Sequence, residues 1–247
     1  MNEKAFLIWN SACETHPGKV RSINQDAYLD LPELGIWAVA DGMGGHEAGE
    51  IASRTIVDEL RLINEPRDIH SFADEIKIRL QRANDKLRQL ASQQYRNNTI
   101  GSTIVVLAAF GQQCAFLWVG DSRIYRIRNG VMEQITKDHS MIEDYIDQGL
   151  LTPEQAATSS IANVLTRAVG AEDDLEVDCL IETMSDGDIY LLCSDGLYRE
   201  VSDEKLMYSM SIPDCDNSAK HMLNLALEGE AKDNITASVV RIQAAKL

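Results

Sequence analysis

Apolar residues gather in several runs of strand length, and short turns join some neighbouring runs. Neighbouring strands that are joined by short turns favour antiparallel sheets. The predicted strands cover Ile36–Ala40, Thr103–Ala109, Cys114–Val119, Ser122–Arg128, Asp188–Cys193 and Thr236–Ile242.

Two other stretches repeat apolar residues at helical spacing. The first stripe runs from Ala52 to Ile63 and the longer one from Phe72 to Leu90. A further helix is predicted over about residues 218–228, and the sequence from Thr152 to Gln155 has the residue types of a capping box at a helix start. The order of elements predicts an α+β fold in which helices cover antiparallel sheets.

Three of the predicted strands lead into an aspartate, directly at Asp41 and after one intervening residue at Asp121 and Asp195. Asp233 instead precedes the last strand, so its carboxylate reaches the same edge if that strand runs the other way. Asp-Gly is also ordinary turn chemistry, but turns alone do not explain the whole set. Asp186 provides a comparison, because a strand of six residues at about 3.3 Å each separates it from Asp195 by roughly 20 Å. Asp186 is therefore predicted to lie outside any site that holds Asp195.

If these four carboxylates converge, with Asp26 nearby, their repulsion destabilises the fold unless protons or cations neutralise it. Histidines and cysteines do not show zinc-ligand spacing, and oxygen ligands favour Mg²⁺ or Mn²⁺. Two such ions bridged by a carboxylate lower the pKa of a shared water, which makes hydroxide available near neutral pH.

Charge and composition narrow the class of protein. The 247 residues carry 39 acidic and 23 basic side chains, a net charge of −16. This balance excludes a nucleic-acid partner held by phosphate neutralisation, and a solvated acidic surface accounts for most of the excess. The length fits one core, so we expect a single domain over residues 1–247.

The cysteines and the apolar runs indicate the compartment. The five cysteines form no Cys-x-x-Cys pair, and an odd number does not suit a disulfide framework. The apolar run over residues 5–9 is too short for a secretion signal, and the run over 104–110 is too short to span a membrane. We therefore expect a soluble, cytoplasmic protein without a membrane partner.

Six short motifs follow one another along the chain: Arg21-Ser22-Ile23-Asn24-Gln25-Asp26, Asp41-Gly42-Met43-Gly44-Gly45, Gly101-Ser102-Thr103, Gly120-Asp121-Ser122-Arg123, Ser194-Asp195-Gly196-Leu197 and Asp233-Asn234-Ile235-Thr236. This series closely resembles the PPM family, the type 2C metal-dependent protein phosphatases, in its bacterial form. The resemblance covers about residues 21–242. It implies a four-layer α-β-β-α sandwich, two antiparallel β-sheets flanked by helices, with a flap segment over about residues 139–170 beside the active site.

The resemblance also implies the metal ligands. Asp41 would bridge two ions, the Gly42 carbonyl would bind the second, and Asp195 and Asp233 would complete the first. Asp121, with Asp195, matches the third-metal position of bacterial members. The implied cofactors are two or three Mn²⁺ or Mg²⁺ ions per chain.

Two catalytic residues besides Asp41 are implied in the same way. Asp26 resembles the residue that orients a metal-bound water, and Arg21 matches the arginine that grips the substrate phosphate, a role that suits its forked guanidinium. The sequence departs from the family at Gln25, where many members have a glutamate ligand. Met43 stands where eukaryotic members often have a histidine, and His46 is a nearby alternative as general acid.

The implied reaction is hydrolysis of phosphoserine or phosphothreonine on proteins by a water or hydroxide that bridges two metal ions, in opposition to a bacterial Ser/Thr kinase. The cysteines do not form the Cys-x₅-Arg loop of thiol-dependent tyrosine phosphatases. Two alternatives are a hydrolase of small phosphoesters with the same fold and a non-catalytic binding module. Expected partners are phosphoprotein substrates and a cognate kinase, and the expected oligomeric state is a monomer.

Overall fold

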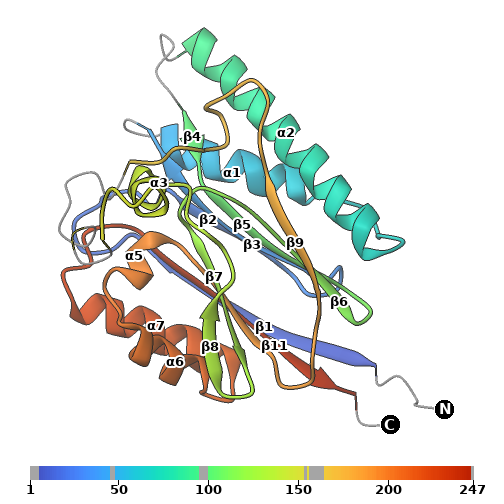
Figure 1. The fold of residues 1–247 in the computed structure, drawn as a ribbon. Coiled ribbons are helices and arrows are strands. Elements are labelled where there is room, and N and C mark those ends of the chain that lie inside the picture. Colours follow the sequence, from blue (N-terminus) through green and yellow to red (C-terminus); the bar gives the residue numbers. More distant parts are fainter. Residues whose placement is uncertain (1–5, 45–47, 95–99, 153–154, 156–163, 246–247) are drawn as a thin grey trace.

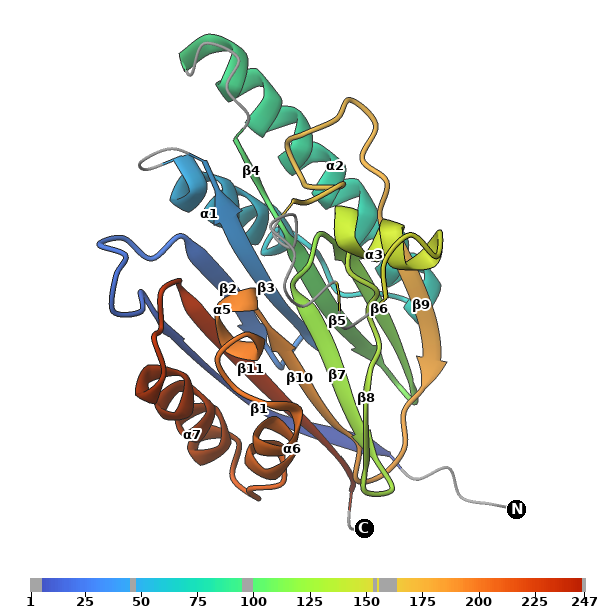
Figure 2. The same ribbon diagram turned by 60° about the vertical axis from the view of Figure 1, so that its left-hand side comes forward.

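The computed structural model of the chain describes residues 6–44, 48–94, 100–152, 155 and 164–245. Two antiparallel sheets pack face to face, and helices cover their outer faces (Figures 1 and 2). The predicted α-β-β-α sandwich is therefore confirmed.

The first sheet contains five strands, and every neighbouring pair in it is antiparallel. In spatial order they are β1 (Leu7–His16), β11 (Ile235–Ala244), β10 (Ile189–Cys193), β7 (Arg123–Arg128) and β8 (Val131–Gln134). The second sheet has the order β2 (Asp26–Leu31), β3 (Ile36–Met43), β5 (Ile104–Phe110), β6 (Gln113–Val119) and β9 (Asp178–Thr183), and the short β4 (Gly101–Ser102) pairs with the end of β3.

Each sheet carries its own pair of longer helices. Helices α1 (Ala48–Leu60) and α2 (Ile69–Gln94) pack on the second sheet, and α6 (Asp203–Met210) and α7 (Cys215–Glu228) pack on the first. Two shorter helices, α3 (Met141–Asp147) and α5 (Asp195–Tyr198), lie toward the edge where β3 and β10 end (Figure 2). Among the described residues, no helix is both long and apolar enough to cross a membrane.

Aromatic side chains fill the space between the two sheets. Trp37, Phe116 and Tyr190 are fully buried there, and the rings of Phe116 and Tyr190 lie 5.6 Å apart. The central strands are covered on both faces, by the opposite sheet and by helices. This double coverage explains why β3, β5 and β6 appear in the sequence as unbroken apolar runs.

The predicted capping box makes both of its hydrogen bonds. The Gln155 backbone N–H donates to Thr152 Oγ1 at 3.3 Å, and the Thr152 N–H donates to Gln155 Oε1 at 2.9 Å. Residues 153–154 and 156–163 lie outside the described residues, as does His46.

Candidate active site

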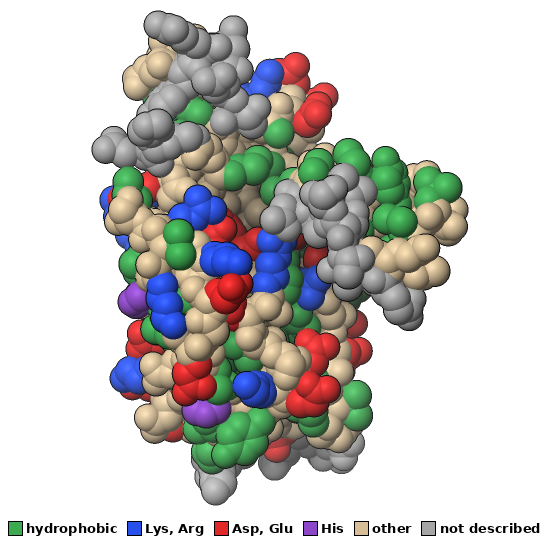
Figure 3. Space-filling model, turned by 90° about the vertical axis from the view of Figure 1, so that its left-hand side faces the viewer, with side chains coloured by type: hydrophobic (Ala, Val, Ile, Leu, Met, Phe, Trp, Pro, Cys, Tyr) green, Lys and Arg blue, Asp and Glu red, His purple; other side chains and the backbone are tan. Residues whose placement is uncertain are grey.

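A pocket of about 420 Å³ opens at the edge where β3 and β10 end. Figure 3 looks onto this end of the molecule and shows acidic and basic side chains side by side in the middle of the face. The residues that line the pocket include six of the seven predicted site residues, namely Arg21, Asp41, Gly42, Asp121, Asp195 and Asp233. The seventh, Asp26, is buried beside them.

The topology explains how distant aspartates meet. Asp195 directly follows Ser194 at the end of β10, and Asp233 stands just before β11. Because β10 and β11 are antiparallel, with Cys193 opposite Ala237, the start of β11 lies at the end of β10. Asp186 is at the other end of β10, where its Oδ1 accepts a hydrogen bond from the Ala244 N–H at 2.7 Å. The structure therefore separates Asp186 from Asp195, as predicted.

Hydroxyl groups fix the backbone of Asp41. Thr103 Oγ1 accepts from the Asp41 N–H at 3.1 Å, and Ser102 Oγ donates to the Asp41 carbonyl at 2.8 Å. Ser122 Oγ lies 2.7 Å from Thr103 Oγ1, so the residue after Asp121 supports the same clamp. The sequence motifs that contain these residues thus hold the carboxylates in place as well as supplying them.

Asp26 faces Asp41 across the β2–β3 pair. Its Oδ2 accepts from Ser194 Oγ at 2.7 Å and from Thr236 Oγ1 at 2.6 Å, both in the other sheet. Its Oδ1 is buried and has no hydrogen-bond partner among the described residues. Burial raises the pKa of Asp26 to about 7 even though the two hydroxyls favour the charged form.

Burial and mutual repulsion raise the pKa of the other carboxyl groups as well. Burial raises the pKa of Asp41 well above its usual range, and the charges of Asp26 and Asp195 add to the effect. Burial and the charge of Asp195 raise the pKa of Asp121 to about 7, although Arg199 opposes the rise. Burial also raises the pKa of Asp195, again against Arg199. A group of carboxylates in this environment requires added positive charge to stay ionised.

Close packing explains the glycine after Asp41. A Cβ atom on Gly42 would lie 1.9 Å from the Gly49 carbonyl oxygen in α1. A Cβ on Gly49 would lie 2.6 Å from both the Gly42 oxygen and Gln25 Nε2. Gln25 also lines the pocket, and its backbone N–H donates to Asn234 Oδ1 at 2.7 Å. Gln25, which replaces the glutamate of many family members, therefore lies beside the Gly42 carbonyl. The resemblance assigns this carbonyl to the second metal.

Two arginines contact the pocket carboxylates. Arg21 Nη2 lies 3.0 Å from Asp233 Oδ2. Arg199 lies 2.9 Å from Asp195 Oδ2 through Nη1 and 3.3 Å from Asp121 Oδ2 through Nη2. Sequence reasoning missed Arg199. The sequence contains one indication of its role: Arg199 stands four residues after Asp195, and this spacing places both side chains on one face of a helical turn.

The flap segment borders the pocket through Leu165. Isolated β-bridges join Ser140 to Leu165 and Ser102 to Val169, so this segment is tied to the strand that clamps Asp41. At its base, His139 Nδ1 accepts from the Gly120 N–H at 3.1 Å, and His139 Nε2 lies 3.3 Å from Asp178 Oδ2. Met43 also lines the pocket, but its thioether carries no proton to donate.

A larger pocket, of about 700 Å³, lies at the far end of β5. Phe110, the last residue of β5, lines it together with Phe6 and Trp9, whereas Thr103 just before β5 lines the aspartate pocket. None of the described residues that line the larger pocket is ionisable. Its size therefore does not make it the better candidate for hydrolytic chemistry.

The donor set fits hard divalent cations. It consists of carboxylate and carbonyl oxygens, and Asp26 adds a buried oxygen without a partner. No three acidic, histidine or cysteine side chains in the described part of the chain stand close enough together to hold a metal ion as they are. Arginines lie against three of the carboxylates instead. The fold and the pocket thus define a two-sheet protein whose pocket is lined by oxygen ligands of the kind that hard divalent cations prefer.

The family follows from comparison with known proteins. The model of the Protein phosphatase 2C family matches residues 18–231, and the chain belongs to this family. It is 31% identical to the serine/threonine protein phosphatase PstP of Mycobacterium tuberculosis over 97% of this chain and 46% of that protein. It is 33% identical to the protein phosphatase PhpP of Streptococcus pneumoniae over 92% of this chain and 94% of that one. The chain therefore spans about half the length of PstP and nearly all of PhpP.

Solved structures agree with this assignment. PppA, described as a key regulatory component of T6SS in Pseudomonas aeruginosa, superposes with a TM-score of 0.88 at 42% identity, over 95% of this chain and 98% of that one. The catalytic domain of PstP in complex with two manganese ions superposes with a TM-score of 0.87 at 30% identity, over 96% of this chain and 99% of that one. These similarities confirm the resemblance and the fold. The roles of individual residues stay predictions.

Proposed function

We propose that this chain hydrolyses phosphoserine and phosphothreonine on proteins with the help of Mn²⁺ or Mg²⁺. The convergence of Asp41, Asp121, Asp195 and Asp233 at one pocket carries the proposal. Membership of the Protein phosphatase 2C family supports it. Asp41, the Gly42 carbonyl, Asp195 and Asp233 would hold the cations, which supply positive charge for the phosphoryl oxygens and acidify the attacking water.

The chain's own residues position the substrate and the water. Arg21 is half-exposed and touches Asp233, so its guanidinium can turn to a phosphate that enters the pocket. Asp26 is fixed through Oδ2 by Ser194 and Thr236, which leaves Oδ1 to accept a proton from a water beside Asp41. Arg21 thus acts on the substrate phosphate, and Asp26 acts on the attacking water.

The proposal includes the biological setting. The substrates are phosphoproteins that a cognate Ser/Thr kinase produces, and the flap beside Leu165 contacts them. The chain acts as a monomeric single domain in the cytoplasm. Net charge of −16 disfavours acidic substrates at long range, so we expect phosphosites flanked by basic residues to be preferred.

The test uses an aryl phosphate and a phosphothreonine peptide with Mn²⁺, and again with EDTA. Asp41→Asn and Asp195→Asn should each lower kcat by about 10²-fold or more, because each removes charge that the transition state needs. Asp186→Asn is the matched control, since it changes an aspartate at the other end of β10 and should leave kcat unchanged. Metal-independent turnover that survives both active-site substitutions would refute the proposal.

The same assay separates the alternatives. Comparison of phosphopeptides with small phosphorylated metabolites at matched concentration distinguishes a protein phosphatase from a hydrolase of small phosphoesters. A higher kcat/KM on the metabolites would overturn the proposed substrate class, and binding of phosphopeptide without turnover would indicate a non-catalytic module.

A further inference from the structure

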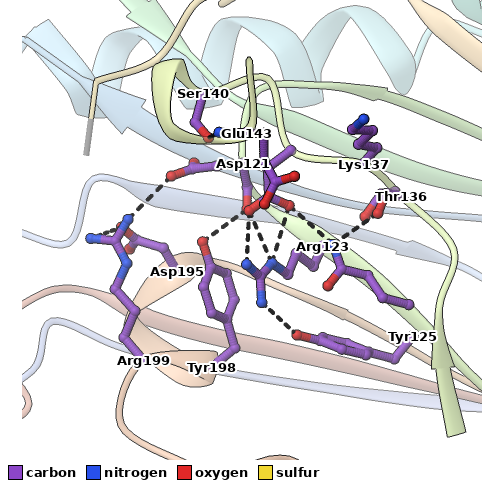
Figure 4. Close-up of polar contacts among 12 residues, drawn as sticks. Asp121, Arg123, Tyr125, Thr136, Lys137, Ser140, Glu143, Asp195, Tyr198 and Arg199 are labelled. Atoms are coloured by element: carbon purple, nitrogen blue, oxygen red, sulfur yellow. Dashed lines mark hydrogen bonds and ion pairs between the residues drawn. The ribbon is translucent and has the colours of Figure 1, made fainter. Parts of the chain in front are cut away.

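Arg199 occupies an unusual position for a surface arginine. It directly follows α5, four residues after Asp195, and its side chain is about one-third exposed at 35%. Figure 4 shows its guanidinium between two carboxylates from different elements. One nitrogen lies 2.9 Å from Asp195 Oδ2 and another lies 3.3 Å from Asp121 Oδ2. Two nitrogens of the Arg199 guanidinium thus bind the carboxylates of Asp195 and Asp121 at the same time.

The surroundings hold this arrangement in place. The Tyr198 hydroxyl donates to the Asp121 carbonyl at 3.1 Å, and the Arg123 guanidinium lies 3.8 Å from the centre of the Tyr198 ring (Figure 4). Arg123 is in turn fixed by Asp138, to which Nη2 donates at 2.8 Å. The Asp121 backbone is therefore held by Tyr198, and the Tyr198 ring by Arg123, two residues that do not line the pocket.

The acids that Arg199 binds are the pair that the family resemblance assigns to a third metal ion. Asp121 is buried, with its side chain 8% exposed, so its charge requires a close positive partner. Arg199 provides that charge from the chain itself. A divalent cation bound between Asp121 and Asp195 would have to displace a guanidinium that makes two ion pairs.

Arg21 makes a different kind of contact. Its side chain is 53% exposed, and it lies against Asp233 through a single nitrogen. Asp233 is therefore easier to free for a cation than the pair that Arg199 holds.

We propose that the Arg199 guanidinium takes the place of a third divalent cation between Asp121 and Asp195, so that this chain binds two such cations. The inference rests on the proposed function, because it assumes that Asp41, Asp195 and Asp233 hold the other two. Arg199 is a positioning residue in this scheme, since it acts through the two aspartates.

The test counts Mn²⁺ ions by electron paramagnetic resonance titration of the full chain after removal of metal. The wild type should bind two ions and Arg199→Met three, because the substitution frees both carboxylates. Combining Arg199→Met with Asp121→Asn should return the count to two. If Arg199→Met does not fold, Arg199→Gln provides the same neutral change. Arg199→Lys keeps a positive charge and should bind two.

Arg167→Met is the matched control. Arg167 has a similarly exposed side chain, at 36%, and also pairs with two acids, Glu176 and Asp178. Removing it should leave the count at two, whereas an extra ion would mean that any freed pair of acids binds Mn²⁺ and would overturn the proposal. A wild type that binds three ions and loses one in Asp121→Asn would also overturn it. Failure of the proposed function appears differently, as a wild type that binds no ion and turns over substrate in EDTA.

Discussion

At the scale of single residues, the site depends on carboxyl groups whose burial raises their pKa, so that added positive charge is needed to keep them ionised. Asp26 shows this most clearly, because it is buried in a layer between the two sheets and is hydrogen-bonded to hydroxyls from the opposite sheet. Its charge state therefore links pH, metal binding and stability.

The metal-free chain should lose stability as the pH rises. The folded pKa of Asp26 is about 7, and an aspartate in the unfolded chain has a pKa of about 3.9. The folded state binds more protons between these values, so this contribution is full below about pH 4 and is lost as the pH rises through 7. Thermal melts in EDTA should show the free energy of unfolding falling by about 4 kcal/mol across this range.

Asp26→Asn provides the control for this pH effect. The amide can keep a hydrogen bond to one hydroxyl but does not titrate, so the slope of stability with pH should become shallower. It should not vanish, because burial also raises the pKa of Asp41 and Asp121. An unchanged slope would mean that Asp26 is ionised in the metal-free fold.

Thr103→Val should weaken catalysis through the backbone of Asp41. Valine has nearly the same shape but leaves the Asp41 N–H without its 3.1 Å acceptor, at a cost of about 1–3 kcal/mol. We expect kcat to fall about 10-fold or more as the carboxylate loses its fixed position. Thr103→Ser keeps the hydroxyl and should retain most of the activity, and equal losses in both variants would contradict this account.

The residue scale also shows the limit of sequence reasoning. The aspartates could be predicted because each terminates or precedes a strand, a pattern visible in the sequence. Arg199 could not be recognised in the same way, because an arginine after a short turn is common and its second partner, Asp121, is 78 residues away. Only the pairing of β7 with β10 brings them together.

At the scale of elements, strands that are buried on both faces were predictable and edge strands were not. β3, β5 and β6 were predicted to within a few residues because both faces are apolar. β1 and β9 escaped prediction, since their residues are mostly half-exposed and polar residues interrupt the pattern. Helix α6 was missed for a related reason, because its eight residues bury only three side chains.

The flap should loosen in acid. His139 Nδ1 accepts the Gly120 N–H, so this contact needs a neutral imidazole. Burial lowers the pKa of His139, and the positive charge of Arg167 lowers it further. Asp178 opposes both effects. The stability from this group is present above the unfolded pKa of about 6.5 and is lost as the pH falls through the lower folded value.

Hydrogen exchange measures this effect. Amides of residues 164–170 should lose protection at about pH 5.5 relative to about pH 7.5, after correction for intrinsic rates. His139→Gln replaces the imidazole with an amide that does not titrate in this range, so its protection should depend less on pH. Equal pH dependence in the two proteins would show that another group controls the flap.

At the scale of the whole molecule, the site joins the two sheets. Asp41 belongs to β3 of one sheet, whereas Asp195 follows β10 and Asp233 precedes β11 of the other. A cation held by all three would therefore connect the two halves of the sandwich. Sequence patterns predicted the layers, but they did not reveal the hydrogen bonds from Ser194 and Thr236 to Asp26 that join the two halves beside the pocket.

Mn²⁺ should therefore stabilise the whole fold. At a concentration 100 times the dissociation constant, a ligand that binds the folded state alone adds about 2.7 kcal/mol. We expect Tm to rise by several degrees when Mn²⁺ is added at about pH 8. Asp41→Asn and Asp195→Asn should reduce this rise, and Asp186→Asn should preserve it. A rise of the same size in all four proteins would place the stabilising ions elsewhere.

The β1–β11 pair also decides where attachments can be made. Leu7 lies opposite Ala244, while His16 at the other end of the pair lies opposite Ile235, next to the pocket. Ten residues of strand, at about 3.3 Å each, separate the two ends. A fluorescent tag or a surface tether joined through Leu7 or Ala244 therefore lies at the end of the molecule remote from the aspartate pocket, and an immobilised chain can keep that pocket open to large binding partners.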